Sequence, residues 1–261
     1  HEIKQIVSAL EEARASSKPS VILAKTVKGK GVSFLENREG WHGKALLKKE
    51  LKRALKEIQK KNFPKIKVPI ISEIELGYRL LPNVKLVAIT GTNGKTTTTT
   101  LISLMLECPV AGNIGKPLIL IRDNTLKYIS VEVSSYQLET IDTFKPHISV
   151  ILNVTPDHME RHGNMERYAE AKAQVFKNQT AEDYVVYNAN DPLVKKVVEA
   201  KAKCQKVPIY PKKPLEQNIL EARAVAKICG VADSFVDKVL ANFKGVEHRI
   251  EEVLEVNGVI A

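Results

Sequence analysis

Apolar residues along the chain recur with helical spacing at the amino terminus, and they predict two amphipathic helices there. The first pattern spans residues 2–16, where an apolar residue returns every three or four positions. The second ends near Lys61, because Asn62-Phe63-Pro64 follows it and disfavours helix. A short strand is expected between them, over residues 21–24.

From residue 70 onward, short β-prone runs alternate with helical patterns. Strands are expected at residues 86–89, 128–133, 148–154 and 184–187. Helices are expected at residues 72–80, 101–106, 165–177, 191–202, 218–229 and 232–242. Ser72 followed by Glu75 has the spacing of a capping box. The alternation predicts an α/β fold, with a mostly parallel sheet flanked by helices.

Composition places this fold in a water-soluble class. The 261 residues are 44% hydrophobic and 27% charged, which suits a buried core and disfavours disorder. The chain has neither an apolar run of transmembrane length nor a signal-peptide pattern. Cys108, Cys204 and Cys229 form no CxxC pair, which argues against a zinc ribbon and fits a reducing cytoplasm. We therefore expect a cytoplasmic protein.

The net charge of +10 belongs mainly to the first segment. Residues 1–62 hold 15 Lys and Arg against 7 Asp and Glu, whereas the remaining residues hold 25 against 23. Within residues 47–61, however, the lysines alternate with leucines, as on the solvated face of an amphipathic helix. We therefore expect neither nucleic acid nor membrane as a partner.

The segment KLVAITGTNGKTTTTT, residues 85–100, has the context of a phosphate-binding loop. It misses the strict pattern G-x-x-x-x-G-K-[ST], because Ile89 stands where the first glycine belongs. A strand, a glycine loop and a helix nevertheless aim backbone N–H groups at an anion. Lys95 would then reach the phosphates, and Thr96 would hold magnesium through its hydroxyl. The alternative is a glycine turn with an incidental lysine.

Polar clusters follow four of the expected strands, at residues 91–96, 132–135, 153–162 and 188–191. In an open parallel sheet, ligands bind beyond the carboxyl ends of the strands. Glu132 is the unusual member, because a carboxylate within an apolar strand is costly unless it is paired. A bound cation and a salt bridge to a nearby lysine are both open explanations.

Two further side chains could contribute to chemistry at this edge. His158 suits a metal ligand or a phosphate partner, although a lone loop histidine is commonly neither. Lys172 lies four residues from both Tyr168 and Phe176, on the same helical face as these rings. A lysine there must be paired, neutralised or extended to solvent.

Six ordered segments within residues 69–258 resemble the Mur ligases of peptidoglycan synthesis: GTNGKTT, AGNIGKPL, VEVSSYQLETI, NVTPDHMERH, YAEAKAQVFKNQ and FKGVEHRIE. The phosphate loop of that family also lacks the first glycine. The VEVSSYQLE form is similar to members that add D-glutamate to UDP-N-acetylmuramoyl-L-alanine. The resemblance implies an ATP-dependent amide ligase, in which the substrate carboxylate becomes an acyl phosphate that the amino group of D-glutamate attacks.

The resemblance also implies roles for individual residues. ATP would be bound by the loop and two later residues: Gly91, Thr92, Asn93, Gly94, Lys95, Thr96, Thr97, Asn218 and Arg249. One magnesium ion would lie at Thr96 and Glu132, and a second at His158 and a carbamylated Lys172. Lys95, His158 and Lys172 would be catalytic. The muramoyl substrate would contact Asn113 and Ser134.

The first 60 residues resemble part of the thiamine-diphosphate domain of transketolase. HEIKQIVSALEEA, PSVILAKTVKGKGVSFLE and WHGK carry the likeness, and His42 matches a histidine near the phosphates of that cofactor. The GDG…N motif that binds the cofactor's metal is absent from the sequence. We therefore do not expect thiamine diphosphate to bind.

These resemblances predict three regions: a transketolase-like fragment at 1–62, a central ATP-binding domain at 63–248, and the start of a carboxyl-terminal ligase domain at 249–261. Because the family's other two domains hold the uridine nucleotide and D-glutamate, this chain is expected to lack ligase activity by itself. The alternatives are a nucleotide-binding module without ligase activity, a related Mur or folylpolyglutamate-type ligase, and a basic interaction segment fused to a folded domain. The family is usually monomeric, and residues 1–62 would be the route to any oligomer.

Overall fold

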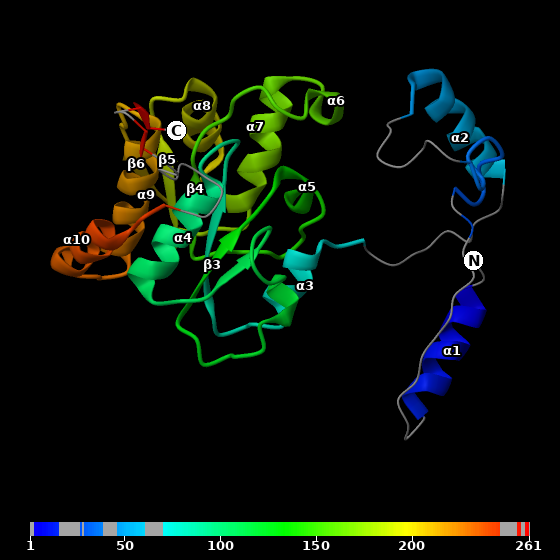
Figure 1. Cartoon of the computed structure of the whole chain (residues 1–261), viewed down its shortest axis with the longest axis horizontal. Coiled ribbons are helices and arrows are strands. Elements are labelled where there is room, and N and C mark those ends of the chain that lie inside the picture. The colour runs from blue at the N-terminus through cyan, green and yellow to red at the C-terminus, as the bar shows by residue number, and fades with distance from the viewer. Residues whose placement is uncertain are drawn as a thin grey trace. The chain divides into compact units, whose positions relative to one another are not determined.

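The computed structural model describes residues 3–15, 27, 29–38, 46–60, 70–245, 255–256 and 259–260. The chain divides into two compact units, His1–Pro69 and Ile70–Ala261. Figure 1 shows both units, and each is described by itself below. Among the described residues, no helix combines the length and the apolar character needed to cross a membrane.

The first unit contains helices α1 (Ile3–Ala15) and α2 (Lys48–Lys60). The turn at residues 29–38 packs against α2, where Ala54 is buried. The Glu57 carboxylate accepts hydrogen bonds from the amide and the hydroxyl of Ser33, at 2.6 and 2.9 Å. The two expected helices are confirmed, whereas the strand expected at 21–24 lies outside the described residues.

The second unit is built on a six-stranded parallel sheet in the order β2-β3-β1-β4-β5-β6. Its strands are β1 (Lys85–Thr90), β2 (Val110–Gly112), β3 (Tyr128–Glu132), β4 (Ile148–Ile151), β5 (Tyr184–Asn188) and β6 (Gln205–Ile209). This architecture confirms the predicted α/β fold. The register sets Ile89 beside Glu132 and Thr90 beside Ile151, so the strands end at one edge.

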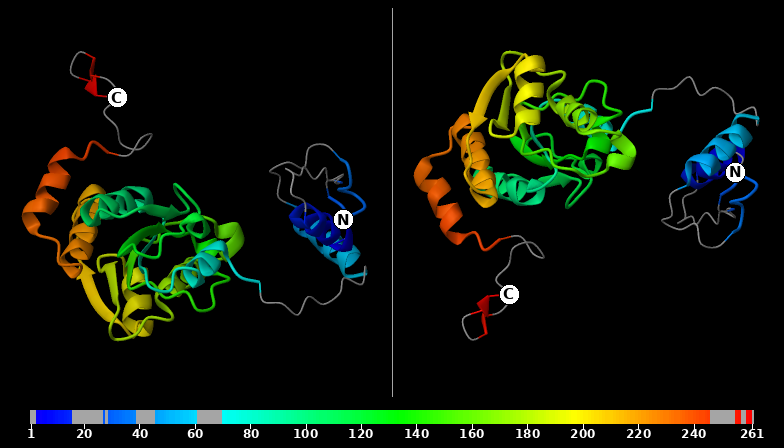
Figure 2. Two further views of the ribbon diagram at one scale, coloured as in Figure 1. Left: turned by 90° about the horizontal axis from the view of Figure 1, so that it is seen from below. Right: turned by 90° about the horizontal axis from the view of Figure 1, so that it is seen from above.

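Helices lie on both sides of the sheet (Figure 2). They are α3 (Glu73–Arg79), α4 (Lys95–Leu106), α5 (Ser135–Leu138), α6 (Met159–His162), α7 (Met165–Ala173), α8 (Pro192–Lys201), α9 (Pro214–Ile228) and α10 (Asp233–Asn242), with 3-10 turns η1 (Leu118–Leu120) and η2 (Gln174–Phe176). A two-stranded antiparallel pair, β7 (Glu255–Val256) and β8 (Val259–Ile260), follows in the chain.

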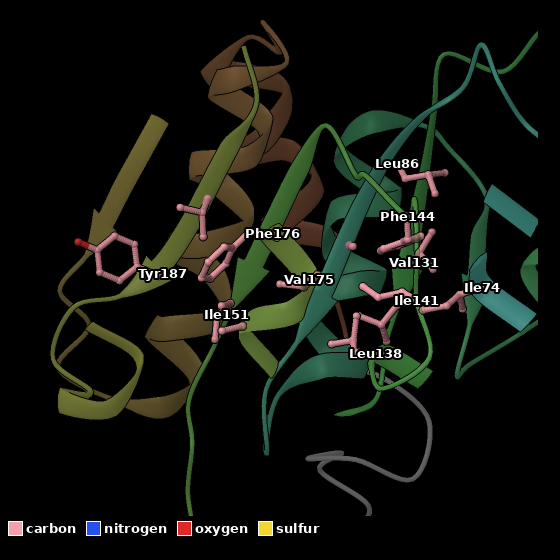
Figure 3. Packing of buried hydrophobic residues seen from close by; sticks show 14 of the residues in the cluster. Ile74, Leu86, Val131, Leu138, Ile141, Phe144, Ile151, Val175, Phe176 and Tyr187 are labelled. Atoms are coloured by element: carbon pink, nitrogen blue, oxygen red, sulfur yellow. The ribbon is translucent and has the colours of Figure 1, made fainter. Parts of the chain in front are cut away.

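Side chains of the central strands alternate between two buried clusters. Leu86 on β1 packs in the cluster that also holds Phe144 and Phe176 (Figure 3). The next residue, Val87, packs in the opposite cluster with residues of α4 and α9. Burial on both faces explains why β1 reads as a continuous apolar run.

The expected capping box at the start of α3 is wrong. Ser72 is the first residue before the helix, but its hydroxyl makes no cap bond and has no partner in the structure. Glu75 is fully buried, and it accepts hydrogen bonds from the amides of Asp142, Thr143 and Phe144. Burial raises the pKa of Glu75, but hydrogen bonds from the Thr143 hydroxyl, from the amides of Asp142 and Thr143 and from Arg79 outweigh it and lower the pKa to about 2. The glutamate therefore holds a distant loop rather than its own helix end.

Candidate active site

The loop between β1 and α4 has the geometry of an anion-binding loop. Gly94 precedes α4 with φ of 84°, in the left-handed region that favours glycine. A Cβ at Gly94 would also overlap the side-chain oxygen of Asn218 from α9. Lys95 is the first residue of α4, so the amino terminus of a 12-residue helix faces this loop.

Asn153, two residues beyond the end of β4, holds the loop from the side of the neighbouring strand. Its backbone carbonyl accepts from the amide of Thr92 at 2.9 Å, and its side-chain oxygen accepts from the amide of Asn93 at 2.9 Å. Its side-chain nitrogen donates to the carbonyl of Asn93 at 3.1 Å. Three bonds from one residue thus fix the exposed tip of the loop.

Two lysine side chains converge on one backbone carbonyl of the loop. Lys95 Nζ donates to Gly91 O at 3.1 Å and to Thr92 O at 2.8 Å. Lys172 Nζ, from α7, donates to the same Gly91 O at 2.8 Å. Two basic groups beside a helix amino terminus favour negative charge at this position.

Lys172 has a buried amino group and a strongly shifted pKa. It is 2% exposed, and its Nζ lies 4.2 Å from the centroid of the Tyr168 ring. Burial, together with the positive charge of Lys95, lowers the pKa of Lys172 to about 7, against the opposing effect of Asp157. The side chain therefore does not extend to solvent, and a large share of it is an uncharged amine near neutral pH.

Glu132, at the end of β3, pairs with the first turn of α4. Its carboxylate is buried and accepts from Thr96 Oγ1 at 2.8 Å and from Asn113 Nδ2 at 3.1 Å. The hydroxyl and the carboxylate thus lie together beside the phosphate loop. Mg²⁺ is commonly held by one or two protein oxygens, with substrate phosphates and water completing its shell, so this pair fits a magnesium site.

His158 follows β4 at the same edge of the sheet, but its side chain is more exposed than those of Glu132 and Lys172. It adopts φ of 52°, which is uncommon for a residue other than glycine. Its Nε2 is 3.5 Å from Asp157 Oδ2, and its ring centroid is 5.1 Å from that of Tyr136 and 6.4 Å from that of Tyr168. Within the described residues, no group of three or more His, Cys, Asp or Glu side chains is arranged to hold a metal. A second ion would need a further anionic ligand.

Three other residues predicted for the site are not brought together with Lys95, Glu132 and Lys172 by any contact described above. Ser134 forms a capping box with Gln137 at the start of α5, so its hydroxyl already has a structural partner. Thr97 is buried in the first turn of α4. Arg249 lies outside the described residues.

Sequence reasoning did not single out two residues that shape this site. Asn153 stood within a predicted polar cluster but was given no role, although it makes the bonds to the loop described above. Gln217, on α9, is buried and donates from Nε2 to the carbonyl of Leu152, the residue before Asn153. Gln217 lies one residue before the helix expected at 218–229, and Asn153 lies within the strand expected at 148–154. Only the structure shows that Gln217 on α9 reaches the residue that follows β4.

A comparison with family models places the chain. Residues 89–228 match the Mur ligase middle domain, and residues 1–74 match the thiamine diphosphate binding domain of transketolase. The first match spans the phosphate loop, Glu132, His158 and Lys172. The chain belongs to the Mur ligase family.

Curated relatives agree with this Mur ligase assignment. The UDP-N-acetylmuramoylalanine–D-glutamate ligase of Caldanaerobacter subterraneus subsp. tengcongensis is 40% identical over 228 residues, covering 73% of this chain and 50% of the relative. The protein of the same name from Clostridioides difficile is 37% identical over 234 residues, covering 73% and 51%. The chain thus spans about half the length of these relatives.

Solved structures support the Mur ligase fold. MurF from Acinetobacter baumannii aligns with a TM-score of 0.58 at 19% identity, covering 69% of this chain and 51% of that one. The UDP-N-acetylmuramate:L-alanyl-gamma-D-glutamyl-meso-diaminopimelate ligase from Neisseria meningitides aligns with a TM-score of 0.57 at 15% identity, covering 75% and 76%. At such identities these likenesses concern the fold.

Proposed function

We propose that residues 63–248 are the ATP-binding domain of an amide ligase and that the phosphates of ATP bind at the loop Gly91–Thr97. The observation that carries this proposal is the convergence of Lys95 and Lys172 on Gly91 O, beside the Thr96–Glu132 pair. Cationic donors and a helix amino terminus stabilise the charge on a transferred phosphoryl group. Asn218, which packs on Gly94, and Arg249 are the proposed contacts on the nucleotide side.

One Mg²⁺ ion is proposed at Thr96 and Glu132, where it would neutralise phosphate charge. A second is proposed at His158 and Lys172, with the lysine carrying a carbamate. Carbamate formation joins the uncharged amine to carbon dioxide and releases a proton, which changes a basic side chain into an anionic oxygen ligand. The buried position and lowered pKa of Lys172 support this role.

The proposed reaction is the addition of D-glutamate to UDP-N-acetylmuramoyl-L-alanine through an acyl phosphate, in the cytoplasm. The names of relatives at 37–40% identity support this choice of amino acid. Asn113 and Ser134 are the proposed muramoyl contacts. The whole ligase reaction also needs the carboxylate and the amine held against the phosphate, because positioning supplies much of the rate.

Calorimetry with MgATP tests the nucleotide site. We expect Lys95→Ala to weaken binding by about ten- to a hundredfold, the usual effect of losing hydrogen bonds from a charged group. Lys227→Ala is the matched control, because Lys227 lies on the exposed side of α9, and it should bind as the wild type does. Equal affinity of wild type and Lys95→Ala would contradict the proposal.

The proposed amino acid is tested by measuring ATP-dependent amide formation. With UDP-N-acetylmuramoyl-L-alanine as acceptor, D-glutamate should support phosphate release, and L-lysine and meso-diaminopimelate should not. Equal turnover with all three amino acids would sink the D-glutamate assignment while leaving the nucleotide site intact.

A further inference from the structure

Glu221 is a fully buried carboxyl group that the proposed reaction does not use. It lies on the inner side of α9, beside Ala222 and Val225, which belong to the hydrophobic cluster that α9 shares with α4. Its Oε1 accepts from Gln217 Nε2 at 3.2 Å, whereas its Oε2 has no hydrogen-bond partner in the structure. A buried charge without a partner is costly, so Glu221 is held as the neutral acid.

Gln217, one helical turn earlier, connects Glu221 to the sheet. The same Nε2 group donates to the carbonyl of Leu152, just beyond the end of β4. The Leu152 amide in turn donates to Thr90 O at the end of β1, at 3.0 Å. Leu152 also lies directly against Gly91, since a Cβ at that glycine would be 2.8 Å from Leu152 Cβ.

The next residue, Asn153, makes the three bonds that fix Thr92 and Asn93. A continuous set of contacts therefore leads from Glu221 through Gln217, Leu152 and Asn153 to the tip of the loop. The neighbour of Gln217 on α9, Asn218, meets the other end of the loop at Gly94.

We infer that Gln217 and Glu221 are positioning residues, which hold the phosphate loop in its ATP-binding geometry through Leu152 and Asn153. The expected effect of these residues on MgATP affinity rests on the proposed nucleotide site. The structural part of the inference can be tested by itself, because the hydrogen bonds that hold the loop all lie within the protein. A preorganised loop loses less freedom when it binds phosphate, so loosening it weakens affinity.

The test without nucleotide is amide hydrogen exchange at Thr92 and Asn93, which donate to Asn153. Gln217→Met keeps the length of the side chain but removes the donor to Leu152, and it should accelerate exchange at both amides about tenfold. The amide of Val186, in the buried strand β5, serves as the probe of global stability and should not change. Unchanged exchange at Thr92 and Asn93 would overturn the inference.

Substitutions at Glu221 separate positioning from packing. Glu221→Gln keeps a neutral acceptor for Gln217 and should leave both exchange and MgATP affinity as in the wild type. Glu221→Leu removes the acceptor and should weaken MgATP binding about fivefold without lowering the urea midpoint of unfolding. Arg223→Met, on the outer side of the same helix, is the control that should change neither affinity nor loop exchange.

The two proposals fail in different ways. If Lys95→Ala binds MgATP as tightly as the wild type, the nucleotide site is wrong, and the exchange data still decide the positioning role. If Lys95→Ala loses binding while Gln217→Met keeps both wild-type affinity and wild-type exchange, only the positioning role is wrong. If Gln217→Met lowers MgATP affinity but also accelerates exchange at Val186 as much as at Thr92 and Asn93, Gln217 only packs in the core and the positioning role is wrong.

Discussion

At the scale of single residues, burial decides which groups are chemically distinctive. Lys172 and Glu221 are both enclosed by the second unit, and burial shifts the pKa of each toward its uncharged form. The two groups differ in their surroundings, because Lys172 faces the phosphate loop and Glu221 faces the core. The amine is therefore available for chemistry, whereas the acid serves structure.

Lys172 should take up carbon dioxide in a pH-dependent way. Since its pKa is lowered to about 7, the reactive uncharged amine is scarce at pH 6 and dominant at pH 8. With [13C]bicarbonate, a carbamate resonance should therefore grow over this range in the wild type and be missing in Lys172→Met. A resonance of equal size in Lys172→Met would show that the carbamate forms elsewhere.

Glu221 should make stability fall as pH rises. Its pKa is raised by burial well above the ordinary value of 4.5, so above that pH the unfolded chain loses a proton that the folded chain keeps. The folded state then binds more protons than the unfolded state, and the free energy of unfolding falls by up to about 1.4 kcal/mol per pH unit. Glu221→Gln should remove this loss.

Urea unfolding between pH 5 and pH 8 measures the effect. The stability advantage of Glu221→Gln over wild type should widen steadily with pH, until the pH reaches the raised pKa of Glu221. An advantage that stays constant across the range would mean that the side chain is already ionised in the folded protein.

At the scale of elements, the sequence predicts the strands that are buried on both faces but misses the strands at the two edges of the sheet. Strands β1, β3, β4 and β5 were expected from their apolar runs, and all four are found in the interior of the sheet. The edge strands β2 and β6 were not expected. Gln205–Ile209 is half exposed and contains Pro208, which removes the apolar pattern that marks a buried strand.

The site was predictable to the extent that parallel strands end at one edge. Glu132 was expected near the phosphate loop because it ends a strand, and Thr96 Oγ1 now lies 2.8 Å from its carboxylate. The alternative was a salt bridge from Glu132 to a lysine. In the structure the buried carboxylate is instead hydrogen-bonded to Thr96 and Asn113. Gln217 could not be found in this way, since its role depends on a hydrogen bond to Leu152, which lies 65 residues away in the sequence.

At the scale of the whole molecule, two family resemblances divide the chain, and the charge follows the division. The basic residues concentrate in the first unit, where Leu47, Leu51 and Leu55 of the α2 segment are also exposed. The boundaries 1–62, 63–248 and 249–261 stay predictions.

The basic helix also offers a second place for an anion to bind, so affinity for ATP alone does not locate the site. An amide NMR titration with MgATP locates it directly. The account predicts shifts at residues 91–97, with Asn218 and the amides near Lys172 following, and no more than weak shifts at residues 46–60. Shifts confined to residues 46–60, with the loop unchanged, would contradict the assignment of the phosphate loop as the nucleotide site.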